Sequence, residues 1–356
     1  MTDFPQRILV RGVNWLGDAV MSTPTLQGLR QATPTSKITL LTHEKLADLW
    51  TSYPHVDEVL TFAAGESVFS IAGRLRGKFD LALVLPNSVR SALECFLARI
   101  PRRVGYARNG RSVLLTQAIA PRAQTVHLRK RSVRNIRRLI NSGKPRTTFP
   151  TSGHQVYDYL HLIGSEATAP KLHVTDKEVQ RARARFFGEK LWLGLNPGAE
   201  YGPAKRWPAE QYIQAALEVR RQTGCECVVF GGPKDKPITG PIAAATDALD
   251  LTGKTTLREL AACFRVCRAL LTNDTGPMHL AAAVGTPVIV PFGSTAPELT
   301  GPQNGEILVG DVPCAPCFRR ECPVDFRCMR SISVAPVVEA TLRAFAADAE
   351  GGRYSR

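Results

Sequence analysis

The feature that most constrains the fold of this chain is an alternation of apolar and amphipathic segments that runs twice along the sequence. The first series begins with RILVRG, at residues 7–12, and continues through KITLLTH, VDEVLTF and DLALVLPN. The second series begins with KLWLGLNPG, at residues 190–198, and continues through CECVVFGGP, RALLTND and TPVIVPFG. Near-continuous apolar strands that alternate with amphipathic helices are typical of parallel sheets covered on both faces.

This pattern predicts an α/β chain with two Rossmann-like, doubly wound domains. The break between the series lies near SEATAPKLHV, so we expect an N-terminal domain at residues 1–170 and a C-terminal domain at 171–335, followed by a helix and frayed tail at 336–356. A chain of 356 residues is long enough for two such domains. Ligands of open α/β sheets bind at the carboxyl ends of the strands, so functional residues are expected in the turns that follow them.

The sequence contains no run of 18 or more apolar residues, and its start, MTDFPQR, lacks the basic and apolar parts of a signal peptide. We therefore expect a cytoplasmic protein without a transmembrane helix.

Positive charge is concentrated in one part of the chain. The formal net charge is +15, and residues 95–157 contain 14 Arg and Lys but no Asp or Glu. A field of this kind attracts an anionic partner, such as a nucleic acid, a membrane surface or an acidic glycolipid. A solvated basic loop without a partner is the alternative.

The first turn that can carry chemistry is GVNWLGDAV, which follows the first strand. Gly12 and Gly17 permit a tight backbone, and Asp18 stands where the helix begins. An acid at this position either stabilises the helix start or takes part in a reaction. The spacing of the glycines is not GxGxxG, so a dinucleotide fingerprint is not supported.

Three turns of the second series predict an anion site. NPGAEYGPAKRWP combines a glycine-rich backbone with a cation just before a helix, and NDTGPMHLAAA opens a helix with a hydroxyl and amide groups; both arrangements suit phosphate. FGGPKDK is a further glycine turn, expected near the base or ribose of a nucleotide. The candidate ligand-binding residues are Gly198, Glu200, Lys205, Gly231, Asp274, Thr275, Gly276 and His279.

Four of the nine cysteines form a C-x2-C-x4-C-x5-C array near the C-terminus, namely Cys314, Cys317, Cys322 and Cys328. Four thiolates close in sequence can make a closed tetrahedral zinc site. An iron–sulfur cluster and four reduced thiols are the alternatives. The remaining cysteines lie in apolar surroundings and are expected to be inert buried thiols.

Taken together, NWLGDAVMSTP, PNS at residues 86–88, NPGAEYGPAKRWP, NDTGPMHLAAAVGTPVIVPFGST and CFRRECP resemble the ADP-heptose:lipopolysaccharide heptosyltransferases of glycosyltransferase family 9. The similarity is closest to the heptosyltransferase II type and covers residues 7–345. It implies a GT-B fold, in which two Rossmann-like domains face a central cleft.

The resemblance also implies an activity. It is the inverting, metal-independent transfer of L-glycero-D-manno-heptose from ADP-heptose to a heptose of the lipopolysaccharide inner core, with no required cofactor. The catalytic acid of the family falls on Asp18, the phosphate-binding lysine on Lys205 and the nucleotide-binding turn on residues 274–276. An inverting transfer needs one base for the acceptor hydroxyl, which here is Asp18, and charge stabilisation for the departing ADP.

The resemblance gives the basic region a partner, since the acceptor carries Kdo carboxylates and lipid A phosphates. We expect these cations to steer the acceptor or to hold the enzyme at the inner face of the inner membrane. The candidates are Arg102, Arg103, Arg108, Arg111, Arg129, Lys130 and Arg131.

Other functions remain open at this stage. Within the family, the acceptor could be that of heptosyltransferase I or III, or the donor another ADP-sugar. A sugar-nucleotide epimerase would use the same fold. A basic RNA-binding protein is the third alternative, although no aromatic-interleaved basic pattern supports a nucleic-acid partner.

Overall fold

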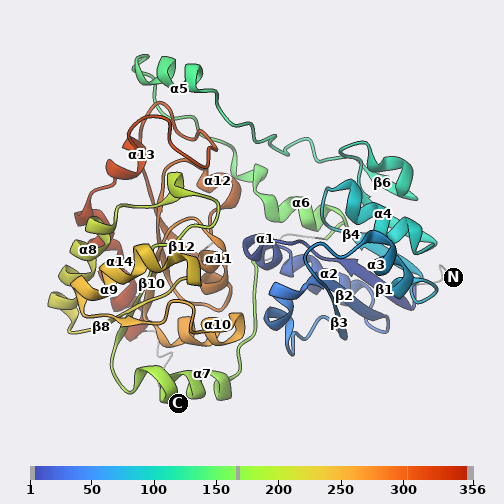
Figure 1. The fold of residues 1–356 in the computed structure, drawn as a ribbon, viewed down its shortest axis with the longest axis horizontal. Helices are drawn as coiled ribbons and strands as arrows, with labels where there is room; N and C mark the ends of the chain where they lie inside the picture. Colours follow the sequence, from blue (N-terminus) through green and yellow to red (C-terminus); the bar gives the residue numbers. More distant parts are fainter. Residues whose placement is uncertain (1–4, 166–168, 303, 351–356) are drawn as a thin grey trace. The chain divides into compact units, whose positions relative to one another are not determined.

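The computed structural model describes residues 5–165, 169–302 and 304–350. These residues form two compact units, each built on a parallel six-stranded sheet (Figure 1). The first unit contains the residues up to Thr125 and Ser152–Leu172, and the second contains Val126–Thr151 and the residues from His173 onward. The expected domain boundary at residue 170 lies close to Leu172, whereas residues 126–151, expected in the N-terminal domain, belong to the second unit.

The first sheet has the strand order β3-β2-β1-β4-β5-β6, which is the order of a Rossmann fold. The direction of strand addition reverses between β1 and β4, so the turns after these two strands leave the sheet side by side. The strands are β1 (Arg7–Arg11), β2 (Lys37–His43), β3 (Glu58–Phe62), β4 (Leu81–Val84), β5 (Arg102–Tyr106) and β6 (Gln117–Ile119). The helices are α1 (Leu16–Met21), α2 (Thr23–Ala32), η1 (Glu44–Trp50), α3 (Val68–Leu75), α4 (Val89–Leu97), η2 (Arg111–Leu114), η3 (Thr151–Gly153) and α6 (Gln155–His161).

The second sheet repeats this topology, with the order β12-β11-β10-β7-β8-β9. Its reversal lies between β7 and β10. The strands are β7 (Trp192–Asn196), β8 (Glu226–Val229), β9 (Leu249–Asp250), β10 (Ala269–Thr272), β11 (Val288–Phe292) and β12 (Gly305–Val309). The helices are α5 (Val133–Ile140), α7 (Asp176–Ala182), η4 (Arg183–Phe187), η5 (Pro203–Lys205), α8 (Ala209–Thr223), η6 (Pro233–Asp235), α9 (Lys236–Thr246), α10 (Leu257–Val266), α11 (Gly276–Ala283), α12 (Pro297–Thr300), α13 (Arg327–Arg330) and α14 (Val334–Glu350).

The central strands β7, β10 and β11 are buried along their whole length because both faces of the sheet are covered. All five residues of β7 are buried, and so are all five of β11. On one face, Leu193 and Leu195 pack in a core to which α8, α9 and α14 contribute. Directly after β8, the ring of Phe230 packs edge-on against the ring of Phe264 in α10.

The first unit follows the same rule. Its core combines Leu9, Leu41 and Ala82 of the sheet with Ile71 of α3 and Cys95 of α4. The expected fold class is therefore confirmed, and the alternation of apolar and amphipathic segments is what specified it.

Some elements differ from the sequence-based expectation. The residues 44–50, expected in an α-helix, form a 3-10 helix, and the basic segment after α4 forms two short strands where one was expected. The edge strand β12 and the helix α5 were not predicted. Among the described residues, none of the helices is both long and apolar enough to cross a bilayer.

Helix α7 starts with a capping box that an arginine reinforces. The amide of Thr175 donates to Glu178, the amide of Glu178 donates to the Thr175 hydroxyl, and Arg258 of α10 donates two hydrogen bonds of 2.6 and 2.7 Å to the Glu178 carboxylate. Burial alone would raise the pKa of Glu178, but Arg258 and Thr175 outweigh it and lower this pKa to about 2. An acid whose pKa is lower in the folded state stabilises the fold above its unfolded pKa of about 4.3, and this stabilisation is lost as the pH falls toward about 2.

We predict that Glu178→Gln lowers the free energy of unfolding at pH 7 by about 1 kcal/mol, because the pair is partly solvated and the glutamine keeps the cap. The difference from the wild type should shrink as the pH falls from about 5, where the unfolded wild-type carboxyl begins to take up its proton. Urea denaturation of both proteins across this range measures it. A difference that does not change with pH would contradict the prediction.

Candidate active site

The two turns predicted to bind an anion lie together in the second unit because their strands are neighbours. Asn196, at the end of β7, pairs in register with Thr272, at the end of β10, and its side-chain amide donates a 3.1 Å hydrogen bond to the Thr272 hydroxyl. Residues 197–206 and 273–276 therefore leave the sheet at the point where the strand order reverses. This is the place where doubly wound sheets bind ligands.

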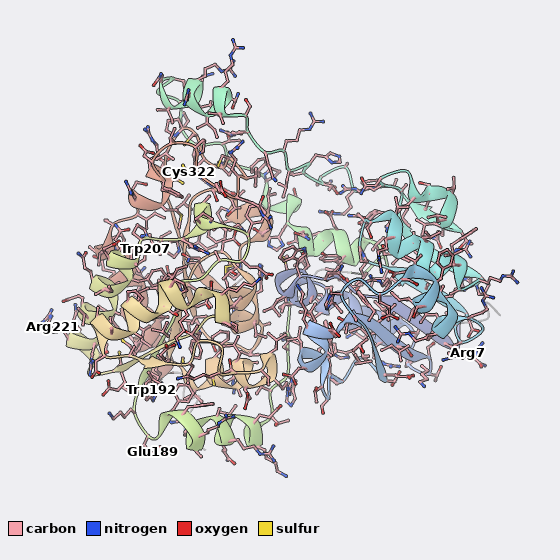
Figure 2. The ribbon with its side chains drawn as sticks, in the orientation of Figure 1. Arg7, Glu189, Trp192, Trp207, Arg221 and Cys322 are labelled. Carbon is pink, nitrogen blue, oxygen red and sulfur yellow. The ribbon has the colours of Figure 1, made fainter. Side chains whose placement is uncertain are left out.

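Asn273 ties the two turns to each other. Its fully buried side-chain amide donates a 2.8 Å hydrogen bond to the carbonyl of Pro197, and its side-chain oxygen accepts a 3.0 Å hydrogen bond from the amide of Trp207. Trp207 is itself buried within the second unit (Figure 2). One side chain thus fixes both ends of the Lys205 turn against the Asp274 turn.

The centre of the site is an ion pair between Lys205 and Asp274. The ammonium nitrogen and a carboxylate oxygen are 2.6 Å apart, and the Thr295 hydroxyl donates a second 2.6 Å hydrogen bond to the same carboxylate. Burial by itself would raise the pKa of Asp274, but Lys205, Thr295 and His279 together hold that pKa below its usual range. Asp274 is therefore ionised at neutral pH, and Lys205 has a fixed anionic partner.

The residues after Asp274 begin helix α11. Thr275 is the N-cap residue, yet its side chain makes no capping hydrogen bond. The first amides of a helix have no acceptor within the helix, so Thr275 and Gly276 present donors at the same edge of the sheet as Lys205. His279 follows within α11 and is buried, and its charge acts on Asp274.

The remaining predicted residues of the second unit fall around the turn after β8. A Cβ on Gly198 would lie 2.7 Å from the Asp235 carboxylate, and one on Gly231 would lie 3.0 Å from the Asp235 Cβ. Asp235 also accepts a 2.9 Å hydrogen bond from the amide of Gly232. Gly198 and Gly231 leave room for Asp235 between the turn after β7 and the turn after β8. Glu200, also predicted to contact the ligand, is exposed to solvent.

In the first unit, Asp18 lies in the first turn of α1 and is half-buried. Trp15 is the N-cap residue of this helix and makes no side-chain cap. One oxygen of Asp18 accepts a 2.5 Å hydrogen bond from the side-chain amide of Gln155. The same oxygen accepts a 3.0 Å hydrogen bond from the hydroxyl of Tyr159, and both donors lie on α6. Burial, and then the Asp18 charge, raise the pKa of Tyr159 well above its usual value, so this hydroxyl stays a donor.

The turn that leads to Asp18 is held by a buried ion pair. Arg11, the last residue of β1, donates a 2.8 Å hydrogen bond to Glu94 of α4, and neither side chain reaches solvent to more than 2%. The guanidinium also donates to the carbonyl of Gly12 and to the side chain of Asn14. The backbone between β1 and α1 is therefore fixed by contacts from inside the unit.

Residues 68–326 match the sequence profile of glycosyltransferase family 9 (heptosyltransferase). The chain belongs to glycosyltransferase family 9. The lipooligosaccharide heptosyltransferase 2 of Haemophilus influenzae is 31% identical over 316 residues, which cover 85% of this chain and 87% of that protein. The lipopolysaccharide heptosyltransferase 2 of Escherichia coli K12 is 31% identical over 318 residues, with the same coverage of both chains.

The fold agrees with this assignment. The solved structure of E. coli ADP-heptose lipopolysaccharide heptosyltransferase II superposes with a TM-score of 0.77 at 27% identity, covering 97% of this chain and 99% of the other. The predicted family, the GT-B fold class and the enzyme class, a glycosyltransferase, are therefore confirmed.

Several residues of this glycosyltransferase site were missed from the sequence. Asn273 and Thr295, which orient the ion pair, and Asp235 lie within or beside motifs that had been noticed. Gln155 and Tyr159 are four residues apart on one helix, which places both on the same face. That spacing was the available signal for a polar pair directed at one partner.

One of the basic residues expected to meet an acceptor is not accessible. Arg111 is fully buried and donates to the carbonyls of Pro86 and Tyr106, where it holds the PNS turn after β4. Burial lowers the pKa of its guanidinium to about 10. Arg111 therefore supports the first unit from within, and the hypothesis that it contacts the acceptor was wrong.

The four C-terminal cysteines of the glycosyltransferase line one cavity together with apolar neighbours such as Ile136 and Val324. Burial raises the pKa of Cys314 and Cys317, and raises that of Cys328 to about 12, so these thiols are neutral. In the parts of the chain that the structure describes, no group of three His, Cys, Asp or Glu side chains could hold a metal ion. The zinc site suggested by the spacing of these cysteines therefore stays a prediction.

We predict that Asp274→Asn destabilises the second unit, because Lys205 would keep a half-buried charge without its carboxylate partner. Breaking a buried ion pair costs about 3 kcal/mol of unfolding free energy. Urea denaturation of the two proteins at pH 7 measures the loss. Thr295→Val is the matched control, since it removes one hydrogen bond to the same carboxylate and should cost about 1 kcal/mol. Equal losses in the two variants would contradict the dominant role of the ion pair.

Proposed function

We propose that this enzyme transfers L-glycero-D-manno-heptose from ADP-heptose to a heptose of the lipopolysaccharide inner core. The observation that carries the proposal is the Lys205–Asp274 pair beside the start of α11, a phosphate-binding arrangement at the reversal point of the second sheet. Two heptosyltransferases 2 that are 31% identical to the chain support the choice of sugar and acceptor.

In this mechanism the second unit binds the donor. Lys205 and the donors at Thr275 and Gly276 contact the diphosphate and stabilise the negative charge that develops on ADP as the bond from the anomeric carbon to the phosphate oxygen breaks. These groups are fixed before the reaction by Asn273 and Thr295, so little reorganisation is needed. This step is proposed to proceed without a metal.

The first unit activates the acceptor. Asp18 takes the proton of the acceptor hydroxyl while that oxygen forms its bond to the anomeric carbon, and the electron pair of the broken bond leaves with ADP. A single displacement inverts the anomeric configuration. Gln155 and Tyr159 position the carboxylate through hydrogen bonds to one of its oxygens.

The test is a transfer assay with ADP-heptose and truncated core acceptors that carry no heptose or one heptose. Product should form with the one-heptose acceptor, should carry the inverted linkage by NMR, and should not decrease with EDTA. Asp18→Asn should lower kcat by about 10²- to 10⁴-fold, as expected for loss of a general base, with unchanged ADP affinity. Glu44→Gln, an exposed acid of the same unit, is the control and should be fully active. Wild-type turnover in a folded Asp18→Asn protein would refute the role of Asp18.

We also propose that the enzyme works at the inner face of the inner membrane and contacts anionic lipid through residues 126–151, here named the basic arm. This arm carries eight Arg and Lys and no acid. Two of the cations are engaged: Arg131 donates to the carbonyl of Pro313 and to Thr147, and Arg146 pairs with Glu298. The exposed ones are Arg129, Lys130, Arg134, Arg137, Arg138 and Lys144.

The basic arm is a folded platform on the second unit. Ile136 of α5 is buried against Cys314 and Cys317, and the amides of Arg131 and Thr147 donate to the carbonyls of Cys317 and Ala315. Figure 1 shows α5 at the end of this unit that also carries α13. The apolar face of α5 is thereby occupied, and its arginines remain for an anionic surface.

We predict that Arg134→Glu/Arg137→Glu/Arg138→Glu weakens binding to vesicles containing phosphatidylglycerol by more than about tenfold, since each basic residue near such a surface contributes about 1 kcal/mol. Co-sedimentation at low and high salt measures it, and wild-type binding should fall as salt rises. Lys177→Glu/Arg181→Glu/Arg330→Glu carries the same charge change at other exposed positions of the second unit. Equal loss in both triple variants would mean that net charge, and not the arm, controls binding.

A further inference from the structure

The cysteine-bearing segment, residues 314–328, makes hydrogen bonds that support both turns of the donor site. The amides of Cys317 and Phe318 donate hydrogen bonds of 3.1 and 2.8 Å to the carbonyl of Ser294. Ser294 directly precedes Thr295, which donates to Asp274. The segment therefore supports the Asp274 side of the ion pair from behind.

The same segment fixes the Lys205 turn. The amide of Ala204 donates a 3.0 Å hydrogen bond to the carbonyl of Arg320, and the hydroxyl of Tyr201 donates a 2.9 Å hydrogen bond to the carbonyl of Phe318. Gly202 has φ +150°, and a Cβ there would lie 2.5 Å from the Arg320 carbonyl oxygen. The backbones approach so closely that only glycine fits at this position.

This contact brings a second cation to the donor site. The ammonium of Lys205 lies 5.1 Å from the centroid of the Tyr201 ring, and the guanidinium of Arg320 lies 5.2 Å from the same centroid. Arg320 is exposed, and no carboxylate pairs with it within residues 5–165, 169–302 and 304–350. Tyr201, in the turn that leads to Lys205, therefore has both cations beside its ring.

The charge balance of the donor site calls for such a cation. Asp274 already offsets the charge of Lys205, so the pair together is close to neutral. The diphosphate of a nucleotide sugar carries two negative charges, and a neutral pair cannot compensate them. A guanidinium is suited to phosphate oxygens, because its planar donors can make two parallel hydrogen bonds.

We propose that Arg320 is a diphosphate-binding residue, and that the cysteine-bearing segment is the element that delivers it to the site. The ligand class is the diphosphate of a nucleoside diphosphate sugar, so this inference rests on the proposed function. Lys205 then remains paired with Asp274 and contributes a hydrogen bond, while Arg320 supplies the uncompensated charge. Affinity for the diphosphate should therefore depend on salt mainly through Arg320.

The experiment is calorimetric titration of the full-length protein with ADP and with adenosine. Arg320→Ala should weaken ADP binding by about tenfold or more, the range for loss of a charge-assisted contact, and should leave adenosine binding unchanged. Arg320→Lys keeps the positive charge but loses the planar pair of N–H donors. Its ADP affinity should lie between those of Arg320→Ala and the wild type. Arg330→Ala, an exposed cation near the end of the same segment, is the matched control and should bind ADP like the wild type.

The outcomes separate this inference from the proposed function. If the wild type binds ADP and Lys205→Ala weakens that binding, but Arg320→Ala does not, then the role of Arg320 is refuted and the proposed function stands. If the wild type does not bind ADP at all, the proposed function and this inference both fail. Thermal melting of each variant excludes unfolding, and an equal loss of ADP and adenosine affinity in Arg320→Ala would also refute a diphosphate contact.

Discussion

The second unit is organised around one ion pair, between Lys205 and Asp274. A pair of this kind is stable away from water only when both charges are hydrogen-bonded and held at short distance. Asn273 joins the two turns, Thr295 donates to the carboxylate, and the neighbouring strands β7 and β10 bring the turns to one edge of the sheet. The ion pair in turn fixes Lys205 where α11 begins.

The two units share one topology. In each, a residue predicted to be functional follows the strand at which the sheet reverses its order: Asp18 after β1 and Lys205 after β7. Gln155 and Tyr159 donate hydrogen bonds to one oxygen of the Asp18 carboxylate, whereas Lys205 pairs with the carboxylate of Asp274.

The cysteine-bearing segment and the basic arm depend on each other. The arm packs Ile136 against Cys314 and Cys317 and bonds its backbone to that segment, and the segment bonds to the turns that hold the ion pair. Cys322 lies at the end of the second unit that α5 occupies (Figure 2). Cys314 and Cys317 are buried at this junction, where they pack against Ile136.

The sequence by itself determined the fold class, the turns that carry the site, and the concentration of positive charge, because hydrophobic period, glycine turns and net charge are properties of neighbouring residues. It predicted Asp18, Lys205 and Asp274 as site residues but not the side chains that they contact. Gln155 lies 137 positions from Asp18, and Asp274 lies 69 from Lys205, so only the packing of distant elements places them together. The burial of Arg111 and the assignment of the basic arm to the second unit were likewise decided by tertiary structure. Such features depend on which surfaces pack together and exclude water, and the order of residues along the chain does not show which surfaces do so.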